Sequence, residues 1–154
     1  MKTVKILSMI AGLILVFSGC KKEDENNNTA LISAHNETES HKNGEACQSC
    51  HSAAGSGKGW FGVAGSVYKQ DLSAISPNGT IYLYTGAGGT GNLFATIEVD
   101  GRGNFFTTAL SIPASGVYAE VKGPSGDTKK MAMLVTSGNC NGCHGTGTEK
   151  IWAN

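Results

Sequence analysis

The chain has no excess of charge of either sign, very little proline and a single arginine. Its 154 residues include 12 Lys and Arg and 12 Asp and Glu, which leaves a formal net charge of zero at pH 7. Because no basic excess is available to meet a phosphate backbone, we expect no nucleic-acid partner. The 22 Gly against 3 Pro indicate a chain with many short turns.

Only one long apolar run is present, and it lies at the start of the chain. It extends from Ile6 to Phe17, after two lysines and before the small residues that precede Cys20. This run is too short for a transmembrane helix, which needs roughly 20 apolar residues. Residues 1–19 are therefore predicted to be a secretion signal peptide and not part of the fold.

The Ser-Gly-Cys sequence at residues 18–20 resembles a bacterial lipobox. The resemblance implies that Cys20 begins the mature chain and carries a diacylglycerol thioether, which would anchor the protein to a membrane. A simple secretion signal with an incidental cysteine is the alternative. Lys22, Glu23 and Asp24 also resemble the surface-export signal of some lipoproteins. The resemblance implies a cell-envelope protein on the outer membrane, at its outer face, although a plain solvated linker explains the same charges.

Residues 20–34 are charged and then rich in asparagine, so they are predicted to be a flexible tether. Residues 35–154 are predicted to form a single domain. No segment after the signal has a sustained helical period, and residues 60–136 alternate between short apolar runs and turns. Strands are expected at residues 61–69, 80–86, 93–100, 104–110, 116–123 and 130–136. This spacing predicts an all-β fold, a small antiparallel β-sandwich of about six to seven strands.

Two short patterns in this region are similar to the transthyretin-like and carboxypeptidase-regulatory-like domains. DGRGNF at residues 100–105 matches a D-x-x-G-x-F turn, and GVYAEVKG occupies residues 116–123. Domains of that kind are usually binding or scaffold modules. The predicted strands also contain no nucleophile paired with a base, so we expect the chemistry to lie outside the sheet.

The pattern Cys-x-x-Cys-His occurs twice. CQSCH at residues 47–51, the first pentad, precedes the first expected strand, and CNGCH at residues 140–144, the second pentad, follows the last. If six strands are connected only by reversals, the first strand begins at the end of the sheet where the sixth finishes. The two pentads are then expected to be neighbours.

Each pentad resembles the attachment site of c-type cytochromes, in which two thiols form thioethers with the haem vinyl groups and the histidine binds the iron. The resemblance implies two covalently attached haem c groups, held in loops at residues 35–59 and 137–154. The residues so assigned are Cys47, Cys50 and the proximal ligand His51 for one haem, and Cys140, Cys143 and the proximal ligand His144 for the other. All five cysteines of the chain are then assigned, one to lipid and four to haem.

Each iron has a sixth position, and few residues are available to fill it. Apart from the pentads, the mature chain has only two histidines, His35 and His41, and two methionines, Met131 and Met133. The simplest assignment uses one histidine per iron, which gives two bis-histidine centres. The methionines are expected on one face of the last strand, where they more often fill a core than bind a metal.

The pattern as a whole predicts an electron carrier, not an enzyme: a membrane-anchored dihaem cytochrome that relays single electrons between redox protein partners. One alternative is a dihaem peroxidase or reductase with an open iron, although no distal arginine–histidine pair is evident. The other is a non-haem surface lipoprotein that serves as a binding module, whose cysteines form a four-cysteine zinc site or disulfides. A thioredoxin-like site is excluded because it requires a βαβ context.

Overall fold

The computed structural model describes residues 29–154, and in that range it contains six β-strands and three short 3-10 helices. The strands are β1 (Val63–Ser66), β2 (Thr80–Gly86), β3 (Thr90–Glu98), β4 (Asn104–Thr107), β5 (Tyr118–Lys122) and β6 (Thr128–Lys130). The helices are η1 (Cys47–Ser49), η2 (Ala87–Gly89) and η3 (Cys140–Gly142). The predicted signal peptide, lipidation site and export signal lie outside the described residues. None of the helices in residues 29–154 has the length and hydrophobicity needed to cross a membrane.

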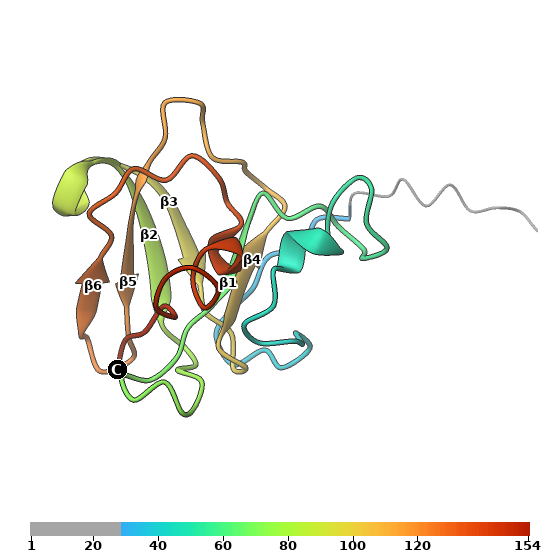
Figure 1. The fold of residues 1–154 in the computed structure, drawn as a ribbon, viewed down its shortest axis with the longest axis horizontal. Coiled ribbons are helices and arrows are strands. Elements are labelled where there is room, and N and C mark those ends of the chain that lie inside the picture. The colour runs from blue at the N-terminus through green and yellow to red at the C-terminus, as the bar shows by residue number, and fades with distance from the viewer. Residues whose placement is uncertain (1–28) are drawn as a thin grey trace, which may run out of the picture.

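The strands form two antiparallel sheets, so the predicted all-β sandwich is confirmed. The larger sheet has the order β3-β2-β5-β6, and the smaller sheet pairs β1 with β4. Figure 1 shows the larger sheet on the left and the smaller one on the right, with η3 in front of the smaller sheet and η1 to its right. Both helices that contain a pentad contact β1.

The alternation of apolar residues explains how the larger sheet packs. In β2, Ile81 and Leu83 are buried, whereas Tyr82 between them is partly exposed, because successive side chains of a strand point to opposite faces. Ile81 lies opposite Val121 of β5, which is also buried. Each such side chain contributes roughly 2 kcal/mol through its removal from water. The core cluster consists of Val63, Val67, Ile81, Leu83, Ile97, Val99, Phe105, Val117, Val121 and Ala153.

The last strand is shorter than expected and begins earlier in the chain. We expected a strand at residues 130–136, but β6 comprises only Thr128–Lys130. The N–H of Met131 still donates to the carbonyl of Ala119 (2.8 Å), and pairing resumes only at an isolated bridge between Val117 and Val135. The residues between leave the sheet, and Met133, which was expected to fill a sheet interface, is 72% exposed.

The ordered domain also begins earlier than predicted. Residues 31–33 belong to the expected tether, yet they run beside β4, where the N–H of Ser33 donates to the carbonyl of Phe106 (3.0 Å). The Ser33 hydroxyl donates to the carbonyl of Glu98 (2.6 Å), and the residue is only 2% exposed. These hydrogen bonds, together with the bridge between Ile32 and Thr107, hold the segment in place. Its apolar stretch of residues 30–32 is too short for composition alone to indicate a strand.

The last described residues return to the segment that follows β1. The N–H of Tyr68 donates to the carbonyl of Ile151 (2.9 Å), and the N–H of Ala153 donates to the carbonyl of Tyr68 (3.0 Å). Ala153 is completely buried. The residues after the second pentad therefore close the core against residues that follow the first pentad.

Candidate functional site

The two pentads fold into the same tight turn. In each, the carbonyl of the first cysteine accepts the N–H groups of the second cysteine and of the histidine. These distances are 3.1 and 2.9 Å in the first pentad and 3.2 and 2.9 Å in the second. The first three residues of each pentad form the helices η1 and η3, and the second cysteine ends each helix with a right-handed helical backbone. The repeated sequence is thus a repeated structure.

Each pentad histidine is held by a backbone carbonyl. Nδ1 of His51 lies 2.8 Å from the carbonyl oxygen of Lys58, and Nδ1 of His144 lies 2.7 Å from that of Glu149. Because a carbonyl can only accept, Nδ1 carries the proton in both rings, and the lone pair of a neutral imidazole is then on Nε2. Metal-binding histidines are commonly oriented in this way by a hydrogen bond from their other nitrogen.

Close packing fixes the ring of His51. The ring stacks on Phe61 with centroids 4.1 Å apart, and Phe61 in turn stacks on Phe106. A Cβ at Gly57 would lie 2.8 Å from Nδ1 of His51, so only glycine leaves room for the ring there. The ring of His41 lies beside His51, with a centroid separation of 5.9 Å. The first pentad thus brings together one proximal candidate and one distal candidate from the sequence.

The four thiols of the pentads are free, and they differ in burial. Cys50 and Cys143 are exposed, whereas Cys47 and Cys140 are partly buried. Burial raises the pKa of Cys47 and raises the pKa of Cys140 to about 12. These two thiols are therefore harder to deprotonate than an ordinary cysteine, and thiolate is the reactive form of the side chain. Within residues 29–154, no three His, Cys, Asp or Glu side chains are placed to hold a metal ion by themselves.

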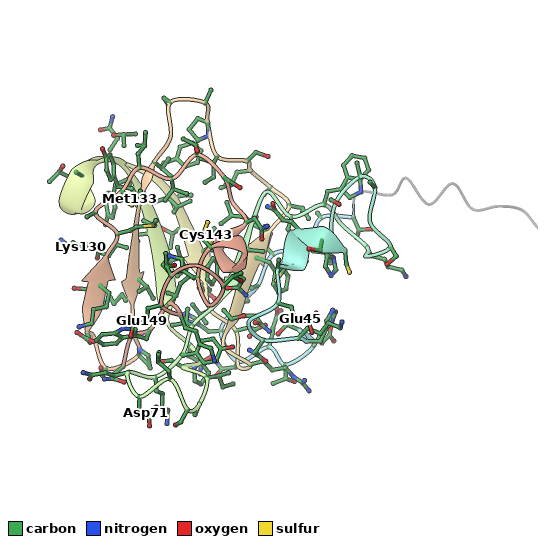
Figure 2. All side chains as sticks on the ribbon, viewed as in Figure 1. Glu45, Asp71, Lys130, Met133, Cys143 and Glu149 are labelled. Carbon is green, nitrogen blue, oxygen red and sulfur yellow. The ribbon has the colours of Figure 1, made fainter. Side chains whose placement is uncertain are left out.

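A large apolar pocket opens beside the second pentad. Its volume is about 640 Å³, within the range of roughly 300–1,000 Å³ that is usual for cofactor pockets. Residues of the larger sheet, including Ile81, Leu83 and Val121, form one wall, and Val63 and Phe105 of the smaller sheet also line the pocket. The chain between Met131 and Trp152 contributes most of the other lining residues, among them Cys140, Cys143 and His144. Figure 2 shows Cys143 beside η3 and Glu149 on the loop that follows it, with Met133 and Lys130 near the β6 edge of the larger sheet.

The two pentads are neighbours, as expected. The side-chain amide of Asn141 in the second pentad donates to the carbonyl of Glu45, two residues before Cys47 (2.9 Å). Asn141 also accepts the N–H of Ser66 and donates to the Ser66 hydroxyl (both 3.1 Å). The expected reason was different, since we expected the sixth strand to end at the same edge of the sheet where the first strand begins. In the structure, the chain after β6 crosses to the smaller sheet before η3, and the pentads therefore meet beside β1.

The other predicted residues divide into two groups. Met131 and Met133 line the pocket, as does Trp152, whose ring lies under Nζ of Lys129 (4.3 Å to the centroid). His35 has its ring against the larger sheet, where Nε2 donates to the carbonyl of Gly79 (2.8 Å). Its Nδ1 lies 3.8 Å from the Glu98 carboxylate, so the interactions of this ring are with residues outside both pentads.

The residues that sequence reasoning missed are those that hold the pentads in place. Asn141 occupies a variable position of Cys-x-x-Cys-His, and Phe61 lies ten residues after His51, so no motif marked either one. Gly57 is the exception, since small residues between His51 and Trp60 are visible in the sequence.

The arrangement fits covalently attached haem at both pentads. Each offers two thiols beside an imidazole with a free Nε2, and the second pentad adds a pocket of suitable size and apolar character. The side-chain oxygen of Asn139, in the pocket wall, is buried and has no hydrogen-bond partner among the described residues. No protein-family model, curated protein or solved structure matches the chain.

Proposed function

We propose that the protein is an electron-transfer dihaem c-type cytochrome. The observation that carries the proposal is the repetition of one structure: both pentads form the same turn, and in both a backbone carbonyl holds Nδ1 of the histidine. Disulfides, or a zinc site made of the four cysteines alone, would use the thiols but give no reason for a matched orientation of His51 and His144. Haem attachment accounts for thiols and imidazoles together.

Haem would supply reversible one-electron transfer at each pentad. His51 and His144 would bind iron through Nε2, because their Nδ1 protons are already engaged by carbonyls. Cys47 and Cys50, and likewise Cys140 and Cys143, would each add S–H across a vinyl double bond, with sulfur bonding to one carbon and hydrogen to the other. The apolar wall of the pocket would exclude water from the second centre.

The protein would exchange electrons with redox protein partners at a membrane. A lipid on Cys20 and the charged residues behind it would keep the domain at the outer membrane of the cell envelope, next to redox protein partners. The exposed thiols Cys50 and Cys143 lie where the edges of the attached groups would approach solvent. Partner proteins would exchange electrons at such edges without entering the fold.

The decisive experiment is a pyridine haemochrome measurement on the full chain, produced in a host that exports proteins and attaches c-type haem. Two covalent haems per chain are expected. Cys50→Ala and Cys143→Ala should each lower this ratio from two toward one, and Ser49→Ala, at a variable position of the first pentad, serves as the control that leaves it at two.

No covalent haem, or an unchanged ratio in both cysteine variants, would show that the assignment is wrong. Metal analysis and thiol titration of the same protein would then separate a zinc site from disulfides. A peroxidase assay on haem-loaded protein separates a carrier from an enzyme, and we expect no turnover above that of free haem.

A further inference from the structure

The pocket at the second pentad has one histidine and two methionines in its wall. His144 follows η3, and Met131 and Met133 lie on the segment that follows β6. All lining residues belong to the described part of the chain, and none of them is a second histidine. The ring of His35 is instead bonded to the carbonyl of Gly79. The imidazole that a bis-histidine centre would need here is therefore missing.

The first pentad has such a second imidazole. The rings of His41 and His51 have centroids 5.9 Å apart. Two imidazoles that bind one metal ion from opposite sides have centroids roughly 6 Å apart, because each metal–nitrogen bond is about 2 Å long and each nitrogen lies about 1 Å from its ring centroid. This separation suits a bis-histidine centre at the first pentad only.

Met131 lies on the sheet face that forms the pocket wall. Its N–H bonds to the carbonyl of Ala119, which continues the β5–β6 ladder in which Lys129 lies opposite Val121. Because side chains two residues apart on a strand share a face, Met131 points the same way as Lys129, and both line the pocket. Met133 comes after the ladder is interrupted and is 72% exposed.

We propose that Met131 is the sixth iron ligand at the second pentad, opposite His144. The inference rests on the proposed function, since it concerns iron that haem would bring. Thioether sulfur is an established axial ligand of haem iron, and the pocket provides no competing imidazole besides His144. The chain then has two different centres, His51 with His41 and His144 with Met131.

Different ligands give the two centres different reduction potentials. Methionine–histidine ligation raises the potential of haem iron, so the second centre is the higher of the two. The haem held by Cys140, Cys143 and His144 would then be the centre that accepts an electron more readily. Because the two pentads are joined through Asn141 and Glu45, the haem held by the first pentad would lie next to it.

The test uses the haem-loaded full chain. The oxidised wild-type protein should show the near-infrared charge-transfer band of sulfur-ligated haem iron, and its redox titration should resolve two waves. Met131→Leu should abolish the band and shift only the higher wave. Met131→His should also abolish the band but keep both irons low-spin by electron paramagnetic resonance, with the higher wave moved down toward the lower one.

Met133→Leu is the matched control, and it should leave the band and both waves unchanged. Loss of the band in Met133→Leu and its retention in Met131→Leu would overturn the assignment. A wild-type protein with two haems but no sulfur band would overturn it as well, and this measurement does not depend on any variant folding. Absence of haem would instead refute the proposed function, so the two failures are distinguishable.

Discussion

The side-chain amide of Asn141 donates a 2.9 Å hydrogen bond to the backbone carbonyl of Glu45 and so joins the two pentads directly. Asn141 is only 3% exposed, and the other hydrogen bonds of its side chain go to Ser66 of β1. A single side chain therefore connects the turn of the second pentad to β1 and to the residues that lead into the first pentad.

Loss of this side chain should destabilise the whole domain. In Asn141→Ala, the buried N–H of Ser66 and the partly buried carbonyl of Glu45 lose their side-chain partner, which should cost about 3 kcal/mol. Gln48 occupies the matching position of the first pentad, and its side-chain amide donates to the carbonyl of Phe61 (2.7 Å). Gln48→Ala should cost only about 1 kcal/mol. Denaturant unfolding of both variants measures the difference, and equal costs would show that Asn141 is not a central connection.

A methyl group at Gly57 should disturb His51 and leave His144 unaffected. In Gly57→Ala the new Cβ would meet Nδ1 and the ring carbons of His51 at 2.8–2.9 Å, so the ring must move away from the carbonyl of Lys58. We expect a changed electron paramagnetic resonance signal from one of the two haems. In the control Gly147→Ala, the nearest atom is a backbone oxygen at 4.0 Å, and both signals should persist. An unaltered spectrum in Gly57→Ala would contradict the tight packing.

The haem-free chain should lose stability at alkaline pH through Cys140. Burial raises the pKa of this thiol from 9.0 to about 12. Between these values the unfolded chain releases the proton and the folded chain retains it, so the free energy of unfolding falls by up to about 1.4 kcal/mol per pH unit. Below pH 9 the contribution is fully present, and above pH 12 it is lost.

Denaturant unfolding from pH 8 to 12 measures this decline. Cys140→Ala should remove the share of the decline that comes from the buried thiol. Cys143→Ala, which lacks an exposed thiol, should leave that share unchanged. In haem-loaded protein Cys140 would be a thioether without a proton to release, so its share of the decline should vanish there too. Identical pH dependence in wild type and Cys140→Ala would contradict the burial effect.

Membrane attachment should depend on Cys20 alone. Cys20→Ala should move the protein from membrane fractions to soluble ones, because one lipid-bearing residue would supply the anchor. The haem-to-protein ratio should stay at two, since the pentads are unchanged. Continued membrane association of Cys20→Ala would show that the signal is not a lipobox.

Features that depend only on neighbouring residues could be predicted from the sequence. The bounds predicted for β2 match the structure, because Ile81 and Leu83 alternate with tyrosines on a sheet that is buried on one face. The pentads needed only their spacing to be found. Both patterns depend on neighbouring residues, so no knowledge of distant contacts was necessary.

Contacts between residues far apart in the chain could not be predicted from the sequence. The apolar residues from Met131 to Val135 indicate burial, but only the fold shows that they border a pocket and do not form a strand. His35 and His41 are equivalent as candidates in the sequence. They are separated by where each ring lies, one against Gly79 and the other beside His51.

The return of Ile151 and Ala153 to Tyr68 has a consequence for how the protein matures. The domain cannot close until the residues after the second pentad have arrived, since contacts between distant segments form late. When such a chain is exported from its N-terminus, the first pentad reaches the far side of the membrane as an open peptide. Under the proposed function, an attachment enzyme meets that pentad unhindered and has only a short interval to act on the second. If haem is attached after export, this topology would therefore favour attachment at the first pentad before the second.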